Sequence, residues 1–219
     1  MPIYKTKNEN FFKNWSPEMA YVLGFFVADG NLALNPRGSR YISFTSCDRD
    51  LLYKIRSLLQ SNHKIASRRR NENNKLAYCL QIGSKIIFND LLKLVLKPNK
   101  SKVLKIPSIR KKYLSNFVRG FFDGDGNVTI SEYHRSDRKS HRGRTILSGF
   151  ISGSKKFLND LREHLQKYAS LGDGTLYFSN GGYRLFYSVN DSRKLYNFMY
   201  NNLSNNLFLE RKKKIFESY

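Results

Sequence analysis

Two aspartates in this sequence hold the same place in two similar nine-residue strings. The string VLGFFVADG spans residues 22–30, and VRGFFDGDG spans residues 118–126, at an offset of 96 residues. Asp29 and Asp125 each stand just before the final glycine. A single Asp-Gly pair is often only a helix end, because both residues are common in turns. Its recurrence at a matched position indicates a shared chemical task, and neighbouring carboxylates repel each other unless a cation lies between them.

The residues available as metal ligands favour a hard cation held by oxygen atoms. Two cysteines, Cys47 and Cys79, are too few for a four-cysteine site or a disulfide framework, and this suggests a reducing compartment inside the cell. The histidines are too far apart in sequence for an H-E-x-x-H zinc site; they are His63, His134, His141 and His164. Magnesium takes oxygen ligands and keeps waters that can attack a phosphodiester. We therefore expect Mg²⁺, with Ca²⁺ as a substitute that does not support cleavage.

Both strings predict helices with one slim face. Small residues recur at every fourth position, at Ala20, Gly24 and Ala28 and again at Asn116, Gly120 and Gly124. Glycine inside a helix costs about 1 kcal/mol relative to alanine, so its presence at matched positions needs a reason. Close packing of the two helices along these faces supplies one. It would bring Asp29 and Asp125 side by side.

The similarity extends along most of the chain. Residues 42–46 correspond to residues 148–152 at an offset of 106, so ten residues are inserted in the second copy. Residues 80–82 are aligned with residues 187–189 at an offset of 107. We interpret the chain as a tandem duplication of two domains, residues 1–107 and 108–219, with the boundary near Pro107.

Hydrophobic periodicity gives each copy the order helix, hairpin, helix, hairpin, helix. In the first copy a helix begins at Ser16-Pro17 and ends at Ala28. Strands are expected over 31–34 and 41–46 and over 64–69 and 75–82, with helices over 50–60 and about 85–96. The second copy starts near Ser115. The fold class is therefore α+β.

The charge of the sequence points to a polyanionic partner. The chain has 39 Lys and Arg against 17 Asp and Glu, which gives a net charge of +22. Residues 1–108 hold 19 of the basic and 7 of the acidic residues, so both halves carry the excess. No run approaches the roughly 18 apolar residues of a spanning helix, so a membrane role is not expected. Nucleic acid is the best fit.

The two strings resemble the paired motifs of the LAGLIDADG homing endonucleases, in the monomeric class with both motifs in one chain. This resemblance implies two αββαββα repeats that form a DNA-binding saddle of antiparallel sheets, with the motif helices packed at the centre. It further implies that Asp29 and Asp125 bind the metal, assisted by the carbonyls of Ala28 and Gly124. The second motif departs from the pattern at Arg119, where a small or apolar residue is usual, and has Asp123 where the first has Val27. We interpret Asp123 as a variant of the motif and not as a ligand.

Basic residues complete the expected site. The family places a lysine near each metal site, and Lys100 and Lys212 match these places, with Lys213 as an alternative to Lys212. Such a cation would stabilise the charge that builds up during phosphoryl transfer. Arginines and lysines of the hairpins are expected to contact DNA, more of them through phosphates than through bases. They are Arg37, Arg40, Arg68, Arg69, Arg70, Lys75, Arg135, Arg138, Lys139, Arg142, Arg144 and Arg184. The inserted residues are expected to form a loop that clamps the DNA backbone.

Together with these residues, the resemblance implies a monomeric, intron-encoded, magnesium-dependent endonuclease that cuts both strands of a long double-stranded DNA target. The target should be asymmetric, because the hairpins of the two copies differ at almost every residue. Two alternatives remain open: a maturase that binds intron RNA, and a DNA-binding regulator without cleavage activity. An intein is not expected, because the sequence starts with Met1 and lacks a terminal asparagine.

Overall fold

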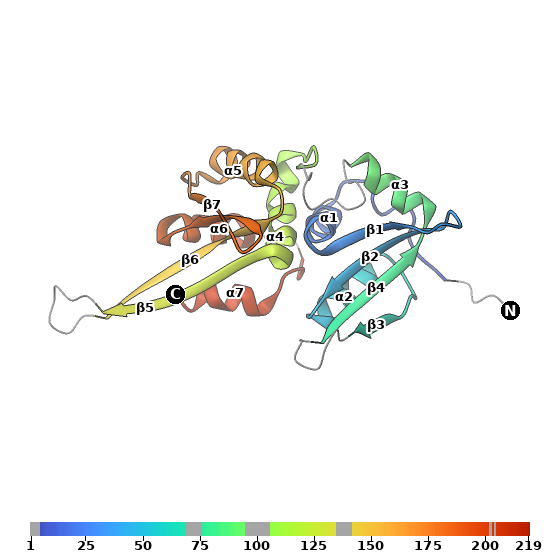
Figure 1. Ribbon diagram of the computed structural model, residues 1–219, viewed down its shortest axis with the longest axis horizontal. Helices are drawn as coiled ribbons and strands as arrows, with labels where there is room; N and C mark the ends of the chain where they lie inside the picture. The colour runs from blue at the N-terminus through green and yellow to red at the C-terminus, as the bar shows by residue number, and fades with distance from the viewer. Residues whose placement is uncertain (1–4, 69–75, 95–105, 135–141, 202, 204) are drawn as a thin grey trace.

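Two helix-and-sheet units flank a central pair of helices in the computed structural model, which describes residues 5–68, 76–94, 106–134, 142–201, 203 and 205–219 (Figure 1). The first unit comprises α1 (Pro17–Asp29), β1 (Gly30–Leu34), β2 (Arg40–Ser46), α2 (Arg49–Leu58), β3 (Ile65–Arg68), β4 (Ala77–Gly83) and α3 (Lys85–Lys93). A 3₁₀ turn (Lys111–Tyr113) leads into the second, which comprises α4 (Leu114–Asp125), β5 (Gly126–His134), β6 (Arg142–Ser152), α5 (Lys155–Ala169), β7 (Thr175–Ser179), β8 (Gly182–Tyr187), α6 (Val189–Tyr200) and α7 (Glu210–Glu217). The expected α+β class and element order are confirmed, and α7 is an addition that the sequence pattern did not predict.

Each unit contains one four-stranded antiparallel sheet. The strand orders are β1-β2-β4-β3 and β5-β6-β8-β7, so the two units have the same topology. Gly30 pairs with Phe44 and Gly126 pairs with Phe150, which confirms the offset of 106 for the second strand of each unit.

The expected alignment of residues 80–82 with residues 187–189 is wrong. Phe44 pairs with Leu80, and its counterpart Phe150 pairs with Leu185, so Leu80 corresponds to Leu185. Val189 lies outside the sheet, at the start of α6. The error has a physical cause: a shift of two residues leaves every side chain of a strand on the same face, so the alternating pattern does not distinguish the two registers.

The insertion in the second unit lengthens its first hairpin. β5 has nine residues and β6 has eleven, against five in β1 and seven in β2. Most of the inserted residues therefore extend a two-stranded ribbon that projects from the body of the molecule, where a loop was expected (Figure 1).

Local capping defines the helix starts that the sequence indicated. The Ser16 hydroxyl accepts a hydrogen bond from the backbone N–H of Met19 at 3.0 Å, and Pro17 occupies the first helical position. Ser84 and Ser154 cap α3 and α5 in the same way, each at 3.2 Å. α4 begins one residue before Ser115 and has no side-chain cap.

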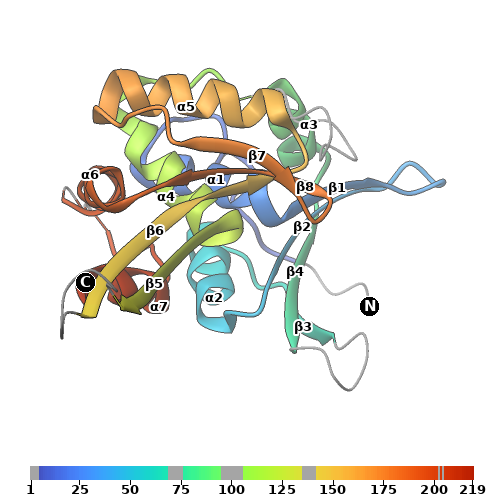
Figure 2. The same cartoon turned by 60° about the vertical axis from the view of Figure 1, so that its left-hand side comes forward.

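Helices cover one face of each sheet and leave the other face open. In the first sheet, α2 and α3 pack against the covered face. This face carries two rows of buried cross-strand neighbours: Leu32, Ile42 and Ile82, and Phe44 and Leu80. In the second sheet Phe150 and Leu185 are buried against α5 and α6, and Figure 2 shows α5 lying across this sheet. Strand alternation therefore assigns every second residue to the open face.

The central helices touch through backbone atoms. A Cβ atom added to Gly24 would lie 2.1 Å from the Phe117 carbonyl oxygen, and one added to Gly120 would lie 2.0 Å from the Tyr21 carbonyl oxygen. Phe117 and Tyr21 are themselves separated by 96 positions, so the two contacts are related by the repeat. The expected packing of α1 and α4 along their slim faces is confirmed.

Candidate functional site

The two motif aspartates are the last residues of α1 and α4. The chain leaves each helix directly into a strand, because Gly30 and Gly126 have extended backbone angles. A Cβ atom at Gly124 would lie 2.3 Å from the Ala28 Cβ and 3.1 Å from Asp29 Oδ2. The carboxylate of Asp29 thus reaches the end of α4, next to the residue that precedes Asp125. Only glycine fits at position 124 without moving Ala28.

The donor set at this place suits a hard cation. Asp29 and Asp125 are both half-buried and offer carboxylate oxygens beside the backbone carbonyls at the helix ends. Within the residues that the structure describes, no cluster of three or more His, Cys, Asp or Glu side chains is found. Two carboxylates with water in the remaining positions match the ligands that Mg²⁺ accepts.

Lys212 is held against the end of α4. Its ammonium group donates to the carbonyls of Phe122 at 2.6 Å, Asp123 at 2.8 Å, Gly126 at 2.7 Å and Gly124 at 3.3 Å. Burial lowers the pKa of Lys212 to about 8, and Asp123, Asp29 and Asp125 act in the opposite direction through their charges. Lys212 is therefore both near the aspartates and engaged with the carbonyl of Gly124, which was expected to assist the metal.

Lys213, the alternative to Lys212, points elsewhere. Its ammonium group forms an ion pair with Glu217 at 2.7 Å and lies over the ring of Phe208. Adjacent residues on a helix face different directions, so only one of the two lysines reaches the end of α4. That lysine is Lys212.

Asp123 is buried in a polar contact between the central helices. Its Oδ2 atom accepts hydrogen bonds from the Tyr21 hydroxyl at 2.6 Å and from the Leu209 backbone N–H at 3.0 Å. Burial raises the pKa of Asp123 to about 6. The corresponding positions of the other repeat are Phe117 and Val27, which are both apolar. Asp123 and Tyr21 thus form a polar pair where the other repeat has the apolar pair Val27 and Phe117.

Arg119 explains the other departure in the second motif. Its guanidinium donates to the carbonyls of Met199 at 2.7 Å and Leu207 at 2.9 Å, and to Asn116 Oδ1 at 2.8 Å. The side chain is 1% exposed. Arg119 therefore connects α4 to the end of α6 and to the segment just before α7. These contacts fix the start of α7, the helix that carries Lys212.

Residues 205–211, which lead into α7 and form its start, also contact the first unit. Lys54 of α2 donates to the carbonyl of Asn206 at 2.8 Å, and Asn205 donates to Glu18 of α1 at 2.9 Å. Arg211 forms a two-point ion pair with Asp48, at 3.0 Å and 2.8 Å. These contacts were not predicted, because they join residues more than 150 positions apart.

The open faces of the two sheets carry different side chains. Asn31, Ser43 and Gln81 are paired across three strands of the first sheet, and Asn31 and Gln81 are exposed. The equivalent row of the second sheet holds Asn127, Gly149 and Phe186. Asparagine and glutamine are suited to adenine edges in the major groove. Sequence reasoning missed Asn31, Gln81 and Asn127, although strand alternation alone indicates their face.

Strand alternation also separates the predicted DNA-contacting arginines. Arg184 lies on the open face, opposite Ile151 and Tyr177, and Arg37 is exposed in the turn between β1 and β2. Arg40 lies on the covered face and donates to Asn89 of α3 at 2.6 Å. Arg144 also lies on the covered face, where it donates to the Ser218 carbonyl at 3.1 Å. Arg184 therefore lies on the open face and Arg37 is exposed in a turn, whereas Arg40 and Arg144 make contacts on the covered face. Their contacts with DNA stay a prediction.

The remaining expected residues are outside what the structure describes. They are Lys100, Arg69, Arg70, Lys75, Arg135, Arg138 and Lys139. The backbones of Arg68 and Arg142 belong to β3 and β6.

The fold is similar to those of solved LAGLIDADG nucleases. The structure of the LAGLIDADG meganuclease I-CpaMI bound to uncleaved DNA has a TM-score of 0.60, with 13% identity over 93% of this chain and 89% of the other. The homing endonuclease I-LtrWI bound to target DNA has a TM-score of 0.59, with 14% identity over 96% and 88%. Mesophilic variants of I-DmoI have a TM-score of 0.59, with 14% identity over 90% and 99%. At these identities the likeness shows the fold.

Sequence models assign the family. The model described as LAGLIDADG-like domain matches residues 16–95, and the model described as LAGLIDADG endonuclease matches residues 118–219. The chain belongs to the LAGLIDADG endonuclease family, with two family domains in tandem. It is also 27% identical over 120 residues to the uncharacterized protein MJ0398 of Methanocaldococcus jannaschii. That match covers 53% of this chain and 41% of the relative, so the chain spans less than half of its length.

The helices offer no membrane span. In the described ranges, none is both long enough and apolar enough to cross a bilayer.

Proposed function

We propose that this chain is a site-specific DNA endonuclease that uses a divalent metal to hydrolyse both strands of a long, asymmetric duplex target. The observation that carries the proposal is the delivery of Asp29 to the end of α4, beside Asp125, between two open sheet faces of a strongly basic chain. A high positive charge provides the affinity for the phosphate backbone that such binding requires. The intron origin of the gene and action as a monomer belong to the same proposal.

Each group at the site has a proposed role in catalysis or in positioning. Asp29 and Asp125 would hold Mg²⁺, which when bound lowers the pKa of its water and neutralises charge on the phosphate. Lys212 holds the carbonyls at the end of α4 and places one positive charge near both carboxylates. The tight contact of Gly24 and Gly120 fixes the two helix ends relative to each other. We assign the first unit to residues 1–107 and the second to residues 108–219.

The asymmetry of the target follows from the open faces. The row Asn31, Ser43 and Gln81 offers amide and hydroxyl groups, whereas the row Asn127, Gly149 and Phe186 offers one amide, because Gly149 has no side chain and Phe186 is only 8% exposed. Amide side chains suit the edges of adenine, so the two rows differ in the base contacts that they can make. Each unit should therefore read a different half-site.

The decisive experiment selects cleaved duplexes from a random library with the wild-type chain and Mg²⁺. The recovered target is then tested with Asp29→Asn and Asp125→Asn, and with Asp173→Asn as a control at an exposed aspartate of the second unit. We expect either motif variant to abolish double-strand cutting and to keep DNA affinity within a few-fold of wild type. The control should cut normally.

Other outcomes identify the alternatives. Unaltered cutting by Asp29→Asn contradicts the metal assignment. Tight duplex binding with no cleavage in any divalent metal indicates a DNA-binding protein without activity. Stronger binding to intron RNA than to every duplex tested indicates a splicing maturase.

A further inference from the structure

A cavity of about 250 Å³ opens beside Asp29 at the inner edge of the first sheet. It is lined by Asp29 and Gly124 of the motif helices and by Thr45 and Ala77, which strand alternation assigns to the open face. Asp48 and Arg211 also line the cavity. The cavity therefore connects the candidate metal site to the surface proposed to face DNA.

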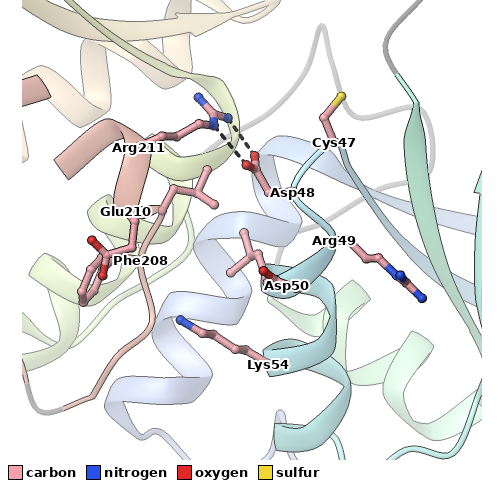
Figure 3. Close-up of a pocket in the computed structure, with 10 residues that line it drawn as sticks. Cys47, Asp48, Arg49, Asp50, Lys54, Phe208, Glu210 and Arg211 are labelled. Carbon is pink, nitrogen blue, oxygen red and sulfur yellow. Dashed lines mark hydrogen bonds and ion pairs between the residues drawn. The ribbon is translucent and has the colours of Figure 1, made fainter. Parts of the chain in front are cut away.

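Arg211 and Asp48 meet across the two units. Arg211 lies in the first turn of α7, and Asp48 is the residue that precedes α2. Their two hydrogen bonds run from Nε to Oδ1 at 3.0 Å and from Nη2 to Oδ2 at 2.8 Å, so the guanidinium is held in one plane. Figure 3 shows the two side chains facing each other over a second cavity of about 500 Å³ between α2 and α7.

The pair is poorly suited to a purely stabilising role. The Arg211 side chain is 58% exposed, and ion pairs at such exposure typically contribute only about 0–1 kcal/mol. The units are already joined by the buried contact of α1 with α4 and by the Lys54 and Asn205 contacts. A fixed orientation of the guanidinium is the more specific result of the two-point contact.

The remaining donors of Arg211 have no partner in the described part of the chain. Guanidinium has five N–H donors, and the contact with Asp48 uses one on Nε and one on Nη2. A planar fork with free donors is the group that proteins use for two-point binding of phosphate. We propose that Arg211 binds a backbone phosphate of the DNA beside Asp29 and that Asp48 positions it for this contact.

This inference rests on the proposed function and adds a phosphate-binding residue that differs from Lys212. The two neighbours divide the work: Lys212 binds the carbonyls of α4, while Arg211 faces the cavity. Because the cavity includes Asp29 but not Asp125, Arg211 acts on the Asp29 side of the candidate metal site more than on the Asp125 side. Its loss should therefore affect the two DNA strands unequally.

The test compares Arg211→Gln, Arg211→Lys and Asp48→Asn on the selected target. Lys194→Gln is the matched control, because Lys194 forms an ion pair with Asp191 on α6 at a similar exposure. The side chains of Lys194 and Asp191 are 48% and 23% exposed, and those of Arg211 and Asp48 are 58% and 26% exposed. Cleavage of each labelled strand is followed at saturating enzyme, and thermal unfolding is recorded for every variant. Should Arg211→Gln fail to fold, Arg211→Lys carries the same comparison.

We expect Arg211→Gln to slow cutting of one strand roughly 100-fold, the typical effect of removing one transition-state donor, and to accumulate nicked DNA. Arg211→Lys should recover part of that rate, and Asp48→Asn should slow the same strand roughly 10-fold. The log-log salt slope of DNA binding should fall by about one for Arg211→Gln, as for one lost phosphate contact. Lys194→Gln should match wild type in all three measurements.

Equal rates on both strands together with an unchanged salt slope would overturn the proposal. If the wild-type chain binds DNA without cutting it, the proposed endonuclease function fails while the salt slope still decides the role of Arg211. If Asp29→Asn behaves as expected and Arg211→Gln does not, only the present inference fails. Absence of any DNA binding overturns both.

Discussion

The hydroxyl of Tyr21 in α1 donates a 2.6 Å hydrogen bond to the buried carboxylate of Asp123 in α4. Tyr21 is completely buried, and Asp123 is 2% exposed. The bond crosses the interface between the two repeats. At the offset of 96, Tyr21 corresponds to Phe117 and Asp123 corresponds to Val27, so the equivalent pair in the other repeat is apolar. A pair of helices that is symmetric in its backbone contacts thus contains one polar bond on one side only.

Loss of this bond should destabilise the helix pair. Tyr21→Phe removes one of the two donors to Asp123 Oδ2 and leaves only the N–H of Leu209. Because the acceptor is a buried carboxyl, we expect a loss of about 1.5–3 kcal/mol in the free energy of unfolding, measured by urea denaturation. Tyr177→Phe, at an exposed tyrosine, should change it by less than about 0.5 kcal/mol. Equal values for the two variants would contradict this account.

The glycine contact between α1 and α4 gives a second prediction. Gly24→Ala and Gly120→Ala place a methyl group within 2.1 Å and 2.0 Å of a backbone carbonyl oxygen, which cannot rotate away. We expect each to destabilise the protein by at least about 2 kcal/mol, because the helices must separate. Gly182→Ala is the control, since its nearest atoms lie at 3.5 Å and 3.6 Å. Denaturation midpoints of all three variants check the prediction, and near-identical midpoints would refute close packing.

The hydrogen bonds of Lys212 predict a loss of stability as well as of activity. Lys212→Met leaves the carbonyls of Phe122, Asp123 and Gly126 without this donor, and it removes a positive charge that lowers the pKa of Asp123. We expect at least about 2 kcal/mol of destabilisation, from unsatisfied buried groups. Lys213→Met loses an ion pair with the exposed Glu217 at 2.7 Å and the contact of its ammonium group with the Phe208 ring, which together should contribute about 1 kcal/mol. A stable Lys212→Met variant that fails only in cleavage would show that the role of Lys212 is confined to catalysis.

Strand alternation predicts which arginines contact DNA. Arg184→Ala, on the open face, should lower the log-log salt slope of DNA binding by about one if it contacts a phosphate, or change the preferred base if it contacts a base edge. Arg144→Ala, on the covered face, should leave both properties unchanged. Fluorescence anisotropy over a range of salt concentrations gives the slope. A larger effect for Arg144 than for Arg184 would mean that DNA lies against the other face.

Much of the fold was accessible from local pattern. Ser16-Pro17 marks the start of α1, Asp-Gly marks the end of both central helices, and alternation marks the strands. The register of β8 was not accessible, because the apolar residues from Leu185 to Val189 fit two alignments that differ by two residues. The length of the ribbon formed by β5 and β6 was also missed, because an insertion rich in Arg and Ser reads as a loop.

The sequence by itself determined the duplication, the slim faces of the central helices and the two aspartates at their ends. These features are repeated at fixed spacing, and helix geometry alone converts the spacing into a face. Only the tertiary structure decided which partners the individual lysine and arginine side chains contact, because these long side chains bind whichever group the packing brings near. It placed Lys212 on the carbonyls of α4, Arg144 on the covered face and Arg211 beside Asp29, through contacts with residues that lie far away in the chain.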